Sequence, residues 1–194
     1  LRNILSINGV TGIFLGEDFL SVNKKDDIAL LRLKNFDYTD ISSRAIPYSI
    51  GDRNSIKVGK KIFSLGYPLS GVLGKDVKLS DGLITSKSGI ESDYSVMQID
   101  APIQPGNSGG PLFSHDGELV GLIVASYSQL HSIESSGTMH QNVNFAIKVN
   151  RLVNMIEELD DAEEILNRKN RLYGHDLSKQ IEILKPITAQ IRTY

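Results

Sequence analysis

Short apolar segments separated by turn residues fill the first 150 residues, and this pattern restricts the fold more than any other feature. Asn8-Gly9, between the first two segments, is typical of a hairpin turn. Helical periodicity is almost absent before residue 148, so the pattern predicts an all-β barrel or sandwich. Strands are expected at residues 3–7, 10–15, 19–22, 28–33, 56–58, 61–65, 77–79, 83–85, 96–99, 118–125 and 143–147.

The pattern changes after Asn150. Apolar residues between positions 152 and 166 recur near helical spacing, with acidic residues between them. We expect one or two helices over residues 148–170, packed against the barrel, and a tail over residues 171–194. The chain is therefore divided into a β domain at residues 1–150 and a C-terminal helical appendage and tail at residues 151–194.

Composition limits the classes of function. The 194 residues carry a formal net charge of −2, which gives no reason to expect nucleic acid or an anionic membrane as a partner. No apolar run reaches the length of a membrane-spanning helix, and no signal-peptide pattern opens the sequence. The absence of cysteine excludes disulfides and thiol chemistry, and it does not identify a cellular compartment.

Residues 106–112 read Gly-Asn-Ser-Gly-Gly-Pro-Leu. Glycines on both sides of Ser108 predict a tight turn that exposes the hydroxyl and lets backbone N–H groups converge without side-chain obstruction. That arrangement suits acyl transfer, because a nucleophile then lies beside donors for the oxyanion of a tetrahedral intermediate. A glycine-rich turn without chemistry is the alternative.

Asp27 stands immediately before the apolar segment Ile-Ala-Leu-Leu at residues 28–31. A carboxylate held by a rigid strand can fix one histidine tautomer and stabilise the imidazolium. Taken alone, Asp27 is better explained as a solvated aspartate at the start of a strand.

Both motifs, in this order, resemble those of trypsin-like serine peptidases of the HtrA/Deg group. Further segments of the chain also resemble that family, in the same order. They lie at residues 50–52, 58–60, 65–68, 80–86, 100–105, 116–121 and 144–147. The resemblance covers roughly residues 4–155.

The resemblance implies a double six-stranded β-barrel, with the first barrel incomplete in this chain and helices after the second. It also implies a serine endopeptidase with polypeptide substrates, no cofactor, and the homo-oligomers found in the family. Ser108 would be the nucleophile, the backbone N–H groups of Gly106 and Ser108 would form the oxyanion hole, and Asp27 would orient the base. Asn107 replaces the aspartate with which many trypsin-like zymogens capture a new N-terminus, so no such activation switch is expected.

The sequence departs from the family at the base, because residues 1–26 contain no histidine. In the family the catalytic histidine lies a few dozen residues before the aspartate, so we expect it upstream of residue 1. The 194 residues alone would then be weakly active or inactive. His115 is expected at a hairpin tip, His131 and His140 in a serine-rich loop, and His175 in the tail, and none has metal-ligand spacing.

Two other functions fit parts of the sequence. Residues 106–110 also match the Gly-x-Ser-x-Gly nucleophile elbow of α/β-hydrolases, but that fold places a helix directly after the serine, where this chain has Pro111. A catalytically inactive, protease-like domain that only binds peptides fits the missing histidine equally well.

Overall fold

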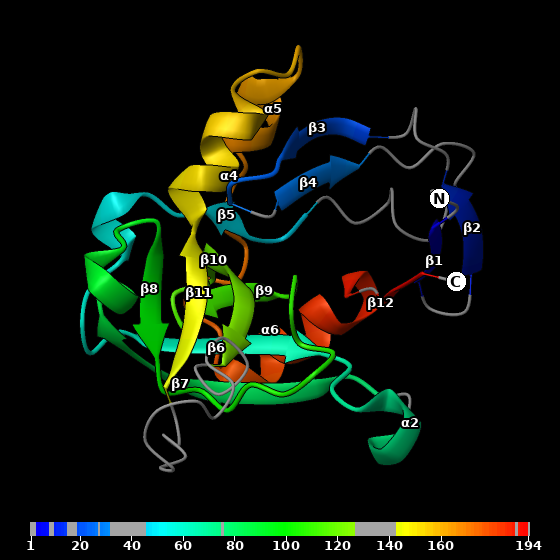
Figure 1. The fold of residues 1–194 in the computed structure, drawn as a ribbon, viewed down its shortest axis with the longest axis horizontal. Coiled ribbons are helices and arrows are strands. Elements are labelled where there is room, and N and C mark those ends of the chain that lie inside the picture. The colour runs from blue at the N-terminus through cyan, green and yellow to red at the C-terminus, as the bar shows by residue number, and fades with distance from the viewer. Residues whose placement is uncertain are drawn as a thin grey trace.

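The centre of the molecule is a closed antiparallel barrel of six strands (Figure 1). The computed structural model describes residues 3–7, 10–14, 19–26, 28–31, 46–74, 76–126, 143–188 and 190–193. Neighbouring strands follow the order β11-β8-β7-β6-β9-β10, and pairing of β10 with β11 closes the ring. The six strands are β6 (Lys61–Gly66), β7 (Lys78–Ser86), β8 (Val96–Ile99), β9 (Pro111–Ser114), β10 (Glu118–Ser126) and β11 (Asn144–Lys148).

Alternating side chains on the barrel strands fill two separate apolar layers. On β6, Ile62 belongs to the cluster that fills the barrel, while Phe63 and Leu65 belong to an outer cluster. This period of two explains why β6 is apolar on both faces. The inner cluster comprises Ile56, Ile62, Ile84, Met97, Ile99, Ala101, Leu112, Val120, Ile123 and Ala146.

The C-terminal helices cover the outer layer. Val149, Leu172 and Leu184 are at most 1% exposed and pack with Phe63 and Phe113 of the barrel. Two helices lie within residues 148–170, where one or two were expected, and an additional helix and strand follow in the segment expected to be a tail. These elements are α4 (Val149–Ile156), α5 (Ala162–Leu166), α6 (Leu177–Leu184), the 3₁₀ turn η4 (Lys185–Ile187) and β12 (Gln190–Thr193).

The N-terminal strands form two small sheets beside the barrel (Figure 1). One contains β12, β1 and β2, and the other is the hairpin of β3 and β4. The hairpin expected around Asn8-Gly9 is therefore confirmed as a strand pair, and the C-terminal strand β12 adds to its free edge. Their bounds are β1 (Asn3–Ile7), β2 (Val10–Phe14), β3 (Phe19–Asn23) and β4 (Ile28–Leu31).

Two strand predictions were wrong in detail. Residues 78–79 and 83–85 belong to one strand, β7, which continues through Gly82 because glycine allows the chain to pass close to Asp100 and Ala101. A Cβ at Gly82 would lie only 2.5 Å from Asp100 Oδ1. Residues 56–58 form no strand: they follow the 3₁₀ turn η2 (Arg53–Ser55), which comes after the short strand β5 (Ser49–Ile50).

The predicted all-β barrel with C-terminal helices is thus confirmed. Two short segments complete the element order, the helical turn α2 (Ser70–Leu73) and the 3₁₀ turn η3 (Ile90–Ser92). Among the described residues, none of the helices has the length and hydropathy needed to span a bilayer.

Candidate active site

Ser108 lies in the loop that joins β8 to β9, on a pair of tight turns. The Asn107 N–H donates to Gln104 O at 3.0 Å, and the Gly110 N–H donates to Asn107 O at 2.9 Å. These two turns bring Ser108 to the outside of the loop, where its side chain is exposed. The expected exposed serine turn is therefore formed by hydrogen bonds within the loop.

Strand β10 holds the same loop from the other side. The Gly109 N–H donates to Ile123 O at 2.7 Å, and the Ile123 N–H donates to Gly110 O at 2.9 Å. The Ser108 hydroxyl donates to Val124 O at 2.6 Å. The nucleophile candidate thus rests on a main-chain carbonyl of β10, and a rotation of its side chain would free the hydroxyl for another acceptor.

Gly106 occupies a position that no other residue fits well. Its φ of +101° lies in the region that favours glycine, and a Cβ there would lie 2.7 Å from Tyr67 O. Within the described part of the chain, neither the N–H of Gly106 nor that of Ser108 is bound to an acceptor. Among the described residues, two backbone donors next to the serine thus have no acceptor.

Two asparagines fix the loop to the barrel. Asn144 of β11 donates from Nδ2 to Ala101 O at 2.7 Å, at the start of the loop. Asn107 is 4% exposed and lies against Gly66, where a Cβ would come within 2.8 Å of its Oδ1. That Oδ1 accepts no hydrogen bond from the described residues. The side chain before Ser108 therefore points into the protein and helps to set the direction of the turn.

Asp27 lies outside the described residues, but the segments on both sides of it are described. Strand β4 begins at the next residue, and Ile28 and Leu30 pack in a cluster with Leu122 and Val124 of β10. Val124 is the residue whose carbonyl accepts the Ser108 hydroxyl. The strand that follows Asp27 thus docks on the strand that supports Ser108.

A partly buried ion pair connects this hairpin to helix α4. Asp26 Oδ2 lies 3.8 Å from Arg151 Nε, and its side chain is 6% exposed. The same oxygen accepts a hydrogen bond of 2.7 Å from Asn23 Nδ2. A nearly buried carboxylate thus has a cation within ion-pair distance directly before Asp27 in the sequence.

Neither of the described histidines contacts Ser108. His115 Nε2 lies 2.7 Å from Asp81 Oδ1, and its ring meets the Phe63 ring edge-on. His175 is exposed in the turn before α6. His131 and His140 lie outside the described residues. Within the described ranges, no group of three His, Asp or Glu side chains could hold a metal ion.

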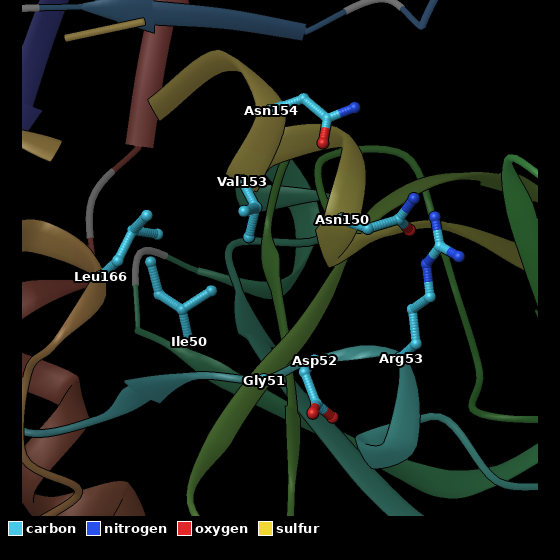
Figure 2. Close-up of a pocket in the computed structure, with 8 residues that line it drawn as sticks. All are labelled: Ile50, Gly51, Asp52, Arg53, Asn150, Val153, Asn154 and Leu166. Carbon is cyan, nitrogen blue, oxygen red and sulfur yellow. The ribbon is translucent and has the colours of Figure 1, made fainter. Parts of the chain in front are cut away.

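A separate cavity of about 330 Å³ lies between β5, η2 and the helices α4 and α5 (Figure 2). Val153 and Ile50 form apolar walls, and the amides of Asn150 and Asn154 project from α4. The residues that line this cavity include none from the serine loop. It is therefore not part of the arrangement around Ser108.

Comparison with known proteins agrees with the sequence motifs. Residues 9–122 match the family model described as a trypsin-like peptidase domain. The chain is 34% identical over 134 residues to the uncharacterized protein y4bJ of Sinorhizobium fredii, covering 69% of this chain and 20% of that protein. It is 30% identical over 160 residues to the serine protease Do-like HtrA of Bacillus subtilis, covering 77% of this chain and 30% of the relative.

The fold also matches a solved structure. The serine endoprotease of Yersinia pestis superposes with a TM-score of 0.56 at 22% identity, over 84% of this chain and 48% of that chain. The match supports the fold. The chain spans between about a fifth and a third of the length of the curated relatives it matches.

Two contacts of the site carry no motif in the sequence. The carbonyl of Val124 cannot be distinguished from any other strand carbonyl, so its contact with Ser108 has no sequence signal. Arg151 is one of many basic residues, but adjacent carboxylates at Asp26 and Asp27 indicate that a cation should lie near. Only the fold shows that Arg151 is this cation.

Proposed function

The chain belongs to the trypsin-like peptidase family and resembles its HtrA-type members, and we propose that it is the part of a serine endopeptidase that carries the nucleophile Ser108. The proposal rests on one observation above all. Ser108 is exposed on a turn fixed from both sides, beside two backbone N–H groups that no described residue uses. The substrates of such an enzyme are polypeptides.

The proposed reaction proceeds through an acyl-enzyme. Ser108 Oγ attacks the scissile carbonyl carbon while its proton passes to a histidine, and the carbonyl oxygen becomes an oxyanion. The N–H groups of Gly106 and Ser108 bind this oxyanion, each contributing about 3 kcal/mol. The histidine returns the proton to the leaving amine, and water then hydrolyses the ester and regenerates the hydroxyl.

Asp27 is proposed to orient the histidine. Docking of β4 on β10 supports this role, because it brings the segment next to Asp27 against the strand that holds Ser108. The histidine itself is proposed to lie upstream of residue 1, since the first 26 residues contain none and His115 is engaged with Asp81. The complete natural polypeptide is therefore the material for every test of activity.

A fluorophosphonate probe tests the nucleophile. The complete polypeptide is expected to react at the peptide that contains Ser108 and to hydrolyse fluorescently labelled casein. Ser108→Ala should abolish the labelling and lower turnover by about 10⁶-fold, and Asp27→Asn should lower it by about 10⁴-fold. Ser178→Ala is the matched control, because Ser178 is exposed on α6 and should react as the wild type does.

A wild-type polypeptide that neither reacts nor hydrolyses casein would overturn the proposal. Retained binding of the casein by that inactive polypeptide would favour the second function, a protease-like domain that binds peptides. The observation behind this alternative is the Ser108 hydroxyl, which donates to Val124 O rather than to a base in the described residues.

A further inference from the structure

A long-range hydrogen bond links the C-terminal segment to the connection that follows β6. Tyr67 Oη donates to Thr188 O at 3.0 Å, across 121 positions of sequence. Tyr67 follows β6 directly, and Thr188 follows the turn η4. The contact therefore joins the end of the helical region to the connection that leaves the barrel after β6.

The backbone of Tyr67 also lies against the proposed oxyanion loop. Tyr67 O is the nearest atom to a Cβ built on Gly106, at 2.7 Å, and Pro68 Cα is next at 3.2 Å. One residue further on, the Leu69 N–H donates to Pro105 O at 2.9 Å. Residues 67–69 therefore run alongside residues 105–106, close enough that a shift of one segment would press on the other.

The acceptor on Thr188 belongs to a well-anchored segment. Thr188 is 7% exposed, and its Oγ1 donates to Leu184 O at 3.0 Å. Leu184 is 1% exposed in the outer cluster with Phe63 and Phe113. The Thr188 carbonyl is thus fixed to the barrel through α6, which makes it a rigid support for the tyrosine hydroxyl.

We infer that Tyr67 is a positioning residue for the oxyanion loop, and that the segment ending at Thr188 is the support that holds it. This inference rests on the proposed function. The hydroxyl fixes the ring, the ring fixes residues 67–69, and those residues fix Gly106. Burial raises the pKa of Tyr67, so the hydroxyl remains a neutral donor through the neutral pH range. Oxyanion donors act through their placement. A small displacement of Gly106 would therefore lower the catalytic rate more than it would weaken substrate binding.

Tyr67→Phe in the complete polypeptide tests this role, because it removes the hydroxyl and keeps the ring. One lost hydrogen bond should reduce kcat and the rate of fluorophosphonate labelling by about three- to tenfold, with KM nearly unchanged. Tyr173→Phe is the matched control, since Tyr173 is 72% exposed. Melting temperature is recorded for each variant, because a purely structural role would change it and leave the labelling rate per folded molecule unaltered.

A double-mutant cycle tests the support. Thr188→Val removes the hydroxyl that ties Thr188 to Leu184 O, and it should slow labelling in the same direction as Tyr67→Phe. If both substitutions act through one contact, the double variant should label at about the rate of the slower single variant. Additive effects, or a Tyr67→Phe variant that labels at the wild-type rate, would overturn the inference. A wild-type polypeptide that does not label at all would instead overturn the proposed function.

Discussion

The serine loop and the β3–β4 hairpin are held to the barrel in different ways. Main-chain hydrogen bonds to β10 and residues 67–69 fix the loop, and glycines allow the close approach. Side-chain packing of Ile28 and Leu30, together with one ion pair at 3.8 Å, fixes the hairpin. The proposed nucleophile therefore has a support that depends on backbone geometry, whereas the proposed acid depends on the side chains that dock its hairpin.

Among the variants that test this comparison, Gly106→Ala should have the largest effect, because it changes the loop where backbone geometry is strictest. The new Cβ would meet Tyr67 O at 2.7 Å, and alanine is strained at a φ of +101°. Displacement of one oxyanion donor should lower casein turnover by about 10²–10³-fold. The measurement is kcat of the complete polypeptide, normalised to the folded fraction.

Gly109→Ala provides the comparison for that variant. Gly109 also has a positive φ, +79°, but a Cβ there meets nothing within 4 Å. Gly109→Ala should therefore lose only about 1 kcal/mol of stability, from alanine in a backbone conformation that favours glycine. Equal losses in both variants would mean that the contact with Tyr67 O does not matter.

Sequence patterns could anticipate the loop better than the hairpin, for a physical reason. The run of glycines around Ser108 encodes tight turns and close approach locally, so the exposed serine could be predicted from residues 106–110. The contacts of the hairpin join residues that are far apart, such as Asp26 and Arg151, and no local pattern encodes them. The C-terminal strand β12 was missed for the same reason, since its partner is β1 at the opposite end of the chain.

Ile28→Ala should have the next largest effect, and it acts on the hairpin. Ile28 is 5% exposed in a cluster with Ile147 and Met155, so its truncation should cost about 2–4 kcal/mol of local stability. Hydrogen exchange should accelerate in β3 and β4, while the Gly109 and Ile123 amides keep their protection. Val22→Ala, at a position that is 53% exposed, is the control.

Equal loss of protection in both regions of Ile28→Ala would contradict the comparison. It would mean that the hairpin and the serine loop open together as one cooperative unit. The separate supports described above would then have no consequence for local stability.

Arg151→Gln should have the smallest effect, and it isolates the ion pair. It leaves the Asp26 carboxylate, 6% exposed, without its cation. Because Arg151 is itself 32% exposed, solvent screening limits the loss to about 1 kcal/mol. The measurement is again hydrogen exchange in β3 and β4.

The double variant Asp26→Asn/Arg151→Gln separates charge from packing. If the uncompensated carboxylate causes the loss, neutralising it should restore much of the protection that Arg151→Gln removes. If the double variant exchanges as fast as Arg151→Gln alone, the arginine acts through packing of its stem against the hairpin. The β3–β4 hairpin would then be held to its neighbours by side-chain packing alone. This would strengthen the contrast with the serine loop, which main-chain hydrogen bonds hold.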